Sequence, residues 1–410
     1  MARRCWLNWP YYKQETTWVP NFLHQNPRRR KKDHHAGAGA RERQRRRRER
    51  HQQQQNQTVP PGSRHLSTPG RLKITLPTIR IPRIQLIAGA VVGVILVIAV
   101  ILFLRGLKPP EVANLPHAIW IGTEWTYAVH EPEDVADLVA QWQENDIGTV
   151  YAWVSWLQED GTWRGAENFT AVRAFVQQVK ELYPQLDLHG WVSFPVNLGE
   201  DGYRLDDEEL QQNIADFSGS VVTELGFDGV FLNIEPVWDG DENFLDLLRK
   251  VRASVGDTVP VSVAVPPDWS PEDADIPVPP LIVPGTIWQT EYKQSVALLT
   301  DQMAVMAYNS GLSEPDDYEI WMAYQVETFA EAIGELGEGT QLLIGIPTYD
   351  AEPPGHDPAV ENVETALAGY AAGLQQAGEA AQFVRGLAIY AGWTTDDLEW
   401  AQFGQWVNRP

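Results

Sequence analysis

The sequence predicts an α/β protein: a (β/α)8 TIM barrel in residues 117–410, preceded by a disordered basic tail and one transmembrane helix. Three observations predict this organisation. After residue 116, apolar strand-like runs alternate with amphipathic helical patterns, which is typical of parallel strands joined by crossover helices. Eight such units fit into roughly 290 residues, a length typical of a (β/α)8 barrel. Before residue 109, the chain is strongly basic and contains a long uncharged run.

The predicted strands alternate regularly with predicted helices. Apolar side chains between the strands recur at the i, i+3, i+4, i+7 spacing of one helix face, with the clearest stripes starting at Val135, Val172, Leu210 and Phe244. A doubly wound open sheet is the alternative. However, Ile119–Thr123, at the end of the first strand, lacks a Gly-rich phosphate loop. The strands are expected to begin near Ala118, Thr149, Asp187, Gly229, Pro260, Met303, Leu342 and Gly386.

Charge divides the chain into two parts. Residues 1–108 hold 22 Lys and Arg against 4 Asp and Glu, whereas residues 109–410 hold 10 against 51. Such a split indicates two compartments with different partners. The acidic part should repel nucleic acid, so no nucleic-acid partner is expected. It contains no cysteine, and its stability must therefore come from its apolar core.

The basic part is predicted to contain a tail and a membrane anchor. Residues 1–83 carry low-complexity basic and glutamine runs with little to bury, which indicates a disordered cytoplasmic tail. Residues 84–105 are predicted to be a transmembrane signal anchor, because Leu86–Leu104 is nineteen residues without a charge and about long enough to cross the hydrocarbon layer. A cleaved signal peptide is the alternative, but its basic leader is normally short.

The topology of the anchor follows from the flanking charges. The Lys and Arg excess on the N-terminal side predicts that this side is cytoplasmic and that the barrel lies outside the cell membrane. Residues 106–116 form a short Pro-rich linker between anchor and barrel. The expected membrane partner therefore binds through residues 84–105.

The fourth predicted strand, Gly226–Pro236, carries the best candidate for chemistry. Side chains alternate across a strand, so Phe231, Asn233 and Glu235 are expected to face the barrel interior. A carboxylate and an amide that point inward are costly unless they are used or well paired. A buried Glu in an ion pair is the alternative to a functional one. The positions expected to face the helices are Val230, Leu232 and Ile234.

This strand resembles the fourth-strand signature of glycoside hydrolase family 18, the chitinases and their relatives, Asp-Gly-x-Asp-x-Asp-x-Glu. Asp228, Gly229 and Glu235 match the signature, whereas Phe231 and Asn233 replace its two later aspartates. The Asn-x-Glu ending is similar to that of the endo-β-N-acetylglucosaminidases of family 85. The acid of the signature is kept as Glu235.

Weaker similarities to family 18 lie on other strands. Met306–Asn309 resembles the family's Met-x-Tyr-Asp, with Asn in place of Asp. Ile344–Tyr349 resembles its Gly-x-Pro-x-Tyr segment, and Trp393 falls where the family places a Trp beneath the reacting sugar. The family's third-strand Ser-x-Gly-Gly is absent, and Gly190–Ser193 stands in its place.

The resemblance implies a retaining, substrate-assisted cleavage of N-acetylglucosamine-containing glycans. Glu235 would protonate the leaving oxygen and later activate water, while the 2-acetamido group of the sugar acts as the nucleophile. Asn233 would orient the acetamide and Tyr308 would donate a hydrogen bond to its oxygen. No cofactor is implied. The predicted substrate-binding residues are Trp393, Asp228, Met306, Asn309, Tyr349, Trp191 and Glu124.

Composition supports a carbohydrate ligand and argues against a metal. Fourteen of the 17 tryptophans follow residue 116, and indoles stack on the apolar faces of sugar rings. Several of them, Trp238 among them, lie in or near strand ends and the loops that follow. Any single tryptophan is more often a core residue, but a whole set on the reacting side of a barrel favours a sugar ligand. The histidines in this region are scattered without ligand-type spacing, so no metal site is expected.

The sequence also allows two other functions. A two-carboxylate retaining glycosidase would need a Glu at the end of strand seven, where the sequence has Thr348-Tyr349-Asp350. A non-catalytic carbohydrate-binding barrel, like the chitinase-like lectins, would typically lack the catalytic Glu, which is kept here as Glu235.

Overall fold

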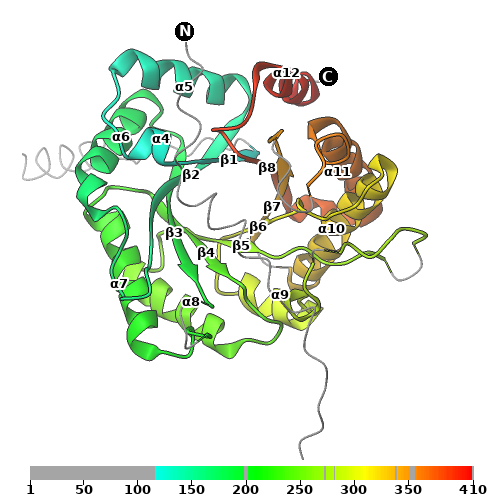
Figure 1. The fold of residues 1–410 in the computed structure, drawn as a ribbon, viewed down its shortest axis with the longest axis horizontal. Coiled ribbons are helices and arrows are strands. Elements are labelled where there is room, and N and C mark those ends of the chain that lie inside the picture. Colours follow the sequence, from blue (N-terminus) through cyan, green and yellow to red (C-terminus); the bar gives the residue numbers. More distant parts are fainter. Residues whose placement is uncertain are drawn as a thin grey trace, which may run out of the picture. The chain divides into compact units, whose positions relative to one another are not determined.

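Eight parallel strands close into a barrel in sequence order in the computed structural model (Figure 1). The structure describes residues 116–408, except for 198–201, 272–273, 281, 338 and 351–355. The predicted barrel is confirmed, and the open-sheet alternative is wrong because β1 pairs with β8. The strands are β1 (His117–Ile121), β2 (Ile147–Trp156), β3 (Asp187–Pro195), β4 (Gly229–Glu235), β5 (Val261–Val265), β6 (Gln302–Val305), β7 (Gln341–Pro347) and β8 (Val384–Tyr390).

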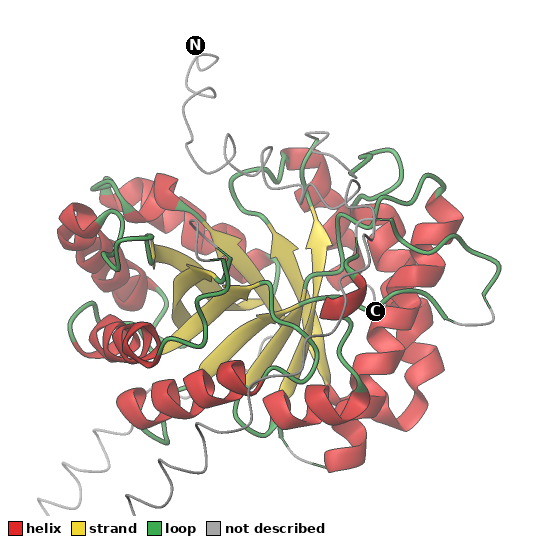
Figure 2. Cartoon of the chain, turned by 60° about the horizontal axis from the view of Figure 1, so that its bottom comes forward, coloured by secondary structure: helices red, strands yellow, loops and turns green. Residues whose placement is uncertain are grey.

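Helices surround the strands (Figure 2). The longer ones are α5 (Pro132–Glu144), α6 (Phe169–Leu182), α7 (Glu208–Thr223), α8 (Glu242–Val255), α9 (Thr290–Ala297), α10 (Pro315–Leu336), α11 (Val363–Ala377) and α12 (Asp397–Val407). Shorter elements are α4 (Thr123–Thr126), η1 (Ala166–Asn168), η2 (Pro284–Thr286) and η3 (Gly378–Phe383).

The helix α8 shows how local sequence places a helix on the barrel. Its buried residues include the predicted stripe that starts at Phe244, so the apolar face packs on the strands and the polar face meets water. Asp241 caps the N-terminus by accepting a hydrogen bond from the backbone N–H of Asn243 at 3.0 Å. The helix ends at Val255 and is followed by Gly256, whose φ of 93° favours glycine.

The strand β4 has the predicted alternation of side chains. Val230, Leu232 and Ile234 belong to the apolar core between strands and helices. Phe231 faces inward, where its ring stacks on Tyr151 with centroids 4.1 Å apart. Burying one aromatic side chain of this kind stabilises the fold by roughly 1.5–3 kcal/mol. The middle of the barrel is therefore a packed aromatic layer.

A buried polar layer lies below this aromatic layer, near the N-terminal ends of the strands. The Ser262 hydroxyl lies 2.8 Å from His189 Nδ1 and donates to Gln302 Oε1 at 2.8 Å. The Tyr151 hydroxyl also donates to Gln302 Oε1, at 3.1 Å. Gly229 makes room for this layer, because a Cβ there would lie 2.8 Å from His189 Nε2. The layer fills the lower barrel, and the sequence patterns did not predict it.

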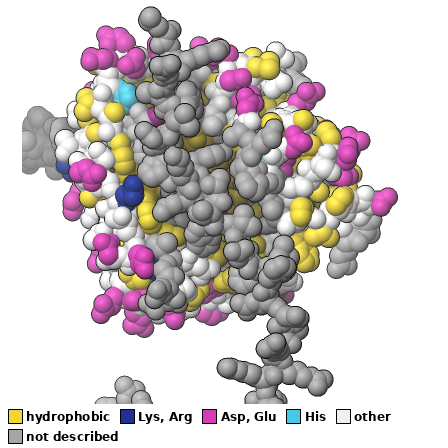
Figure 3. Space-filling model, in the orientation of Figure 1, with side chains coloured by type: hydrophobic (Ala, Val, Ile, Leu, Met, Phe, Trp, Pro, Cys, Tyr) yellow, Lys and Arg dark blue, Asp and Glu magenta, His cyan; other side chains and the backbone are white. Residues whose placement is uncertain are grey.

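The predicted tail 1–83, anchor 84–105 and nearly all of the linker 106–116 lie outside the described residues. No helix in the part of the chain that the structure describes is long and apolar enough to span a bilayer. On the face shown in Figure 3, Asp and Glu side chains are frequent and Lys and Arg side chains are few, as the charge balance of this region requires.

Candidate active site

Glu235 is the last residue of β4 and lies at the C-terminal mouth of the barrel. Its side chain is exposed, whereas the first four residues of the strand are buried. The pairing of β3 with β4 places Ser193 beside Asn233 and Pro195 beside Glu235. The backbone carbonyl of Glu235 accepts a hydrogen bond from Val196 N–H at 2.7 Å, which fixes the strand end. In this fold, the C-terminal mouth is where catalytic side chains occur.

The barrel wall around Glu235 changes the acidity of its carboxyl group. Desolvation by the surrounding protein raises the pKa of Glu235, and the hydrogen bond from Asn233 Nδ2 to Glu235 Oε2 at 3.5 Å partly opposes the rise. A carboxyl whose pKa is raised stays protonated closer to neutral pH. Glu235 is thus suited to donate a proton and still remains reachable by solvent.

We expect Asn233→Leu to raise the pKa of Glu235 further. Leucine keeps most of the volume but removes the amide that stabilises the carboxylate. The carboxyl resonance of Glu235 followed by 13C NMR against pH measures this directly, with Asn168→Leu, in the loop between β2 and α6, as a control. An unchanged or lowered pKa would show that the amide does not stabilise the charged form.

Aromatic side chains cover the mouth beside Asn233 and Glu235. Trp191 stacks on Trp393 with centroids 6.3 Å apart and an interplanar angle of 19°. Trp153 packs edge-on against Trp191 at 4.8 Å. The Trp191 indole N–H donates to Ser193 Oγ at 2.9 Å, on the residue that pairs with Asn233. The two predicted tryptophans are therefore brought together next to the end of β4.

Tyr390, at the end of β8, joins this tryptophan pair to the tyrosines that follow β6 and β7. Its ring stacks on Tyr308 at 4.7 Å and 12°, and it meets Trp393 and Tyr349 edge-on at 5.5 and 6.2 Å. The predicted residues Tyr308, Tyr349 and Trp393 thus share one neighbour. Sequence reasoning missed Tyr390, although an aromatic residue that ends a barrel strand was a usable signal.

The segment after β6 is fixed by a hydrogen bond from a residue that follows β7. Tyr349 donates from its hydroxyl to Asn309 Oδ1 at 2.6 Å. Asn309 has a φ of 54°, in the left-handed region that Asn tolerates better than most residues. Met306, half-buried, continues from β6 on the same segment. The structure therefore joins Tyr349 to Asn309, on the segment after β6 that also carries Met306 and Tyr308.

A buried carboxylate, Glu361, anchors this segment. It is 1% exposed and accepts hydrogen bonds from Asn309 N–H at 2.7 Å and from Ser310 N–H at 2.8 Å. It also accepts one from the Ser310 hydroxyl at 2.5 Å and lies 3.3 Å from His356 Nδ1. Four polar groups thus converge on one side chain. Sequence reasoning missed Glu361 because it lies 52 residues from Asn309.

The structure does not bring Asp228 together with Glu235 or the other predicted substrate-binding residues. Asp228 precedes β4, at the opposite end of the strand from Glu235. There its carboxylate accepts hydrogen bonds from Lys180 Nζ at 2.5 Å and from Leu188 N–H at 3.2 Å. It ties α6 and β3 to the start of β4. At this position, therefore, the residue that matches the signature stabilises the barrel and does not contact Glu235.

Glu124 lies on α4, directly after β1. Its Oε1 accepts a hydrogen bond from Gly122 N–H at 2.9 Å, and its Oε2 is buried with no hydrogen-bond partner among the described residues. Burial raises the pKa of Glu124, while the Gly122 hydrogen bond lowers it. This carboxyl follows a strand end as predicted. No contact in the described part of the chain joins it to Glu235.

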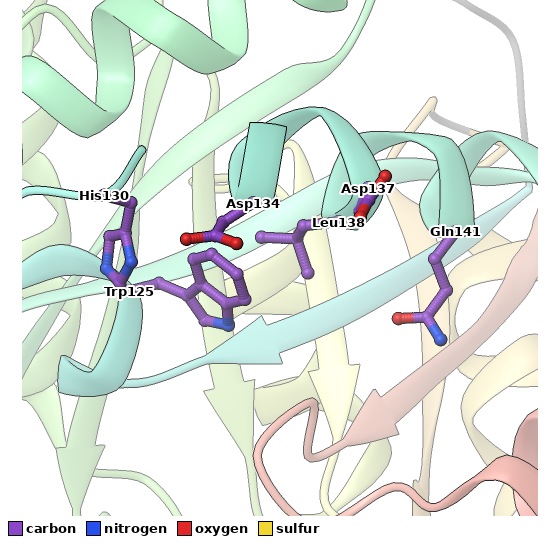
Figure 4. A pocket seen from close by; sticks show the side chains of 6 residues that line it. All are labelled: Trp125, His130, Asp134, Asp137, Leu138 and Gln141. Atoms are coloured by element: carbon purple, nitrogen blue, oxygen red, sulfur yellow. The ribbon is translucent and has the colours of Figure 1, made fainter. Parts of the chain in front are cut away.

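A separate surface hollow of about 390 Å³ lies beside α4 and α5 (Figure 4). It contains none of the predicted catalytic residues and is lined by Trp125, His130, Asp134, Asp137, Leu138 and Gln141. The rings of Trp125 and His130 pack at 4.7 Å. Among the described residues, no group of three or more His, Cys, Asp or Glu side chains could hold a metal ion.

This chain is similar to known proteins in structure only. No protein-family model and no curated protein matches this chain. The spore cortex-lytic enzyme SleL of Bacillus cereus is 10% identical, with 70% of this chain and 73% of that chain covered and a TM-score of 0.47. A chitinase of Rhizomucor miehei is 14% identical, with coverages of 71% and 99% and a TM-score of 0.48. A family 18 chitinase of Cycas revoluta is 15% identical, with coverages of 71% and 98% and a TM-score of 0.46.

Proposed function

We propose that this protein is a glycoside hydrolase that cleaves N-acetylglucosamine-containing glycans with Glu235 as acid and base. One observation carries the proposal: a solvent-reachable carboxyl whose pKa is raised ends β4 at the barrel mouth. The aromatic cover formed by Trp191, Trp393 and Tyr390 supports a sugar ligand, because indole and phenol rings pack on the C–H faces of sugars.

In the first step, the protonated Glu235 gives its proton to the glycosidic oxygen, and the bond from that oxygen to the anomeric carbon breaks. The carbonyl oxygen of the sugar's own 2-acetamido group forms a new bond to the anomeric carbon, which gives a cyclic oxazolinium. In the second step, the Glu235 carboxylate takes a proton from water as the water oxygen attacks the same carbon. The ring opens, the configuration is retained and Glu235 is protonated again.

The side chains next to Glu235 favour this single-carboxylate route. The two inward residues before it on β4, Phe231 and Asn233, cannot act as carboxylate nucleophiles. A retaining enzyme with two carboxylates needs the second carboxyl about 5–5.5 Å from the first, and β7 is followed by Thr348 and Tyr349, both buried. Asn233 and Tyr308 are proposed to hold the acetamide group by hydrogen bonds.

The acetamide requirement gives the test of mechanism. We expect cleavage of N-acetylglucosaminides and little cleavage of the matching glucosides, because only the former carry the nucleophile. A thiazoline made from N-acetylglucosamine copies the oxazolinium ring and should bind more tightly than the parent sugar. Asn233→Ala or Tyr308→Phe should weaken thiazoline binding by up to about tenfold, since one hydrogen bond contributes roughly 0.5–1.5 kcal/mol.

Rates on the two substrate types and calorimetric binding of thiazoline and sugar measure these effects. Tyr183→Phe is a matched control, because the Tyr183 hydroxyl donates to the Ile147 carbonyl at the start of β2 and not at the mouth. Equal rates on glucosides and N-acetylglucosaminides would end the substrate-assisted mechanism and favour a two-carboxylate one. Binding without any turnover would favour a carbohydrate-binding barrel.

We further propose that the barrel is held at the outer face of the cell membrane by residues 84–105. The uncharged run and the basic residues before it support this topology. Protease added to intact cells or protoplasts should digest the region after residue 116 and spare an epitope placed in residues 1–83. Digestion of that epitope with protection of the barrel would reverse the topology.

A further inference from the structure

Trp238 is an exposed tryptophan three residues after Glu235. It lies in the β4–α8 loop, residues 236–241, and 36% of it is exposed. Three residues of extended chain span at most about 11 Å, so Trp238 lies close to the proposed acid. Large aromatic side chains are usually well covered in folded proteins. An exposed tryptophan beside a candidate acid is therefore a candidate for contact with a ligand.

The indole of Trp238 meets the backbone of the neighbouring loop with the edge of its six-membered ring. A Cβ added at Gly285 would lie 2.4 Å from the six-membered ring of Trp238, so only glycine allows this contact. Gly285 belongs to η2, in the segment between β5 and α9. This edge of the indole is thus supported by the neighbouring loop, and part of the side chain is open to solvent. Supported aromatic rings with an open face are suited to stack on a ring-shaped ligand.

The residues on either side of Trp238 fix the loop to the α9 side. The Val237 carbonyl accepts a hydrogen bond from the Trp288 indole N–H at 3.1 Å. Asp239 donates its backbone N–H to the Gly285 carbonyl at 2.9 Å and accepts from Gln289 N–H at 2.8 Å through Oδ1. These contacts hold the backbone of Trp238 without covering its ring.

The C-terminal end of the loop is fixed as well. Asp241 accepts hydrogen bonds from the Tyr203 hydroxyl at 2.8 and 2.6 Å. Its backbone carbonyl accepts one from the Tyr292 hydroxyl at 2.8 Å. Trp238 is therefore presented by a rigid loop, and a preorganised side chain loses little entropy when a ligand binds.

The order of the strands in the barrel indicates the path that a glycan chain would take across the mouth. Trp238 follows β4 and Trp393 follows β8, and in a closed eight-stranded barrel these two strands lie opposite each other. Glu235, at the end of β4, lies on the Trp238 side of the mouth. A glycan that rests on Trp393 and passes Glu235 would next reach Trp238.

We propose that Trp238 is a second sugar-stacking platform, so that the glycan chain crosses the barrel mouth and is bound on both sides of the cleaved bond. This inference rests on the proposed glycosidase function and specifies its substrate class: chains of several sugar residues. The ligand of Trp238 is a sugar residue of the same chain beyond the cleaved bond.

The test compares long and short substrates with the full-length protein. For the hexasaccharide and the disaccharide of β-1,4-linked N-acetylglucosamine, the ratio of their kcat/KM values should fall about tenfold in Trp238→Ala, the scale of one lost aromatic contact. Trp238→Phe should recover part of the loss. Leu298→Ala, which removes an exposed apolar side chain at the other end of the barrel, should leave the ratio unchanged.

The outcomes separate the two proposals. If the protein cleaves both sugars and Trp238→Ala keeps the wild-type ratio, the platform is wrong and the glycosidase function stands. If it cleaves neither, calorimetry on Glu235→Gln with and without Trp238→Ala decides. A selective loss of hexasaccharide affinity of about tenfold would support the platform without catalysis. Equal affinities, or no binding of either sugar, would overturn it.

Discussion

Glu235→Gln is expected to lower kcat by at least about 100-fold on N-acetylglucosamine-containing substrates, the range for loss of a general acid. Glutamine keeps the volume of the side chain but neither donates a catalytic proton nor accepts one from water. The fold should survive, because the Glu235 side chain is exposed and supports no buried ion pair. Steady-state kinetics with circular dichroism of both proteins measure the two effects.

Glu327→Gln is the matched control for this change. Burial and the charge of Glu331 raise the pKa of Glu327 as well, but Glu327 lies on α10, away from the strand ends. It should keep wild-type activity. Near-normal turnover by a folded Glu235→Gln protein would remove Glu235 from the mechanism and return the carbohydrate-binding barrel as the better function.

Glu361→Ala is expected to cost about 3–5 kcal/mol of unfolding free energy, the range for breaking a buried charged cluster by removing one partner. The change strands the N–H groups of Asn309 and Ser310 and the Ser310 hydroxyl without an acceptor. Because the same contacts fix the segment that carries Tyr308, activity should also fall. Urea unfolding followed by fluorescence gives the stability.

A neighbouring carboxylate supplies the control for Glu361. Glu364 is exposed in the first turn of α11, so Glu364→Ala should lose only the favourable interaction with the helix dipole, under about 1 kcal/mol. Equal urea midpoints for Glu361→Ala and wild type would show that the cluster stabilises nothing. The conservative Glu361→Gln should fall between the two, since it keeps an acceptor oxygen but loses the charge.

The fold was predictable because its signals are local. Each strand of the barrel is buried on both faces and appears in sequence as a short apolar run, while each helix shows one apolar stripe. The predicted strand starts fall within about two residues of the observed ones. The inward positions of Phe231, Asn233 and Glu235 followed from the two-residue period of a strand alone.

The site was predictable only where residues lie at strand ends. Glu361 and Asn309 meet through tertiary folding alone, and no spacing rule joins them. The His189, Ser262 and Gln302 layer is likewise assembled from three strands. Asp228 shows the opposite case. It is near Glu235 in sequence, but a seven-residue strand is about 23 Å long, so the two carboxylates lie at opposite ends of the barrel wall.

The packing of Phe231 has a consequence for how the acid is recharged. Phe231 and Asn233 occupy the inward positions that lead up to Glu235, and neither can store a proton. Within β4, therefore, no relay passes protons up from the barrel interior. Each turnover must begin and end with Glu235 exchanging protons with bulk water or with the reacting molecules at the open mouth. The rate of this proton exchange should therefore depend on the buffer and change in deuterated water, and it should not depend on a carboxyl deeper in the barrel.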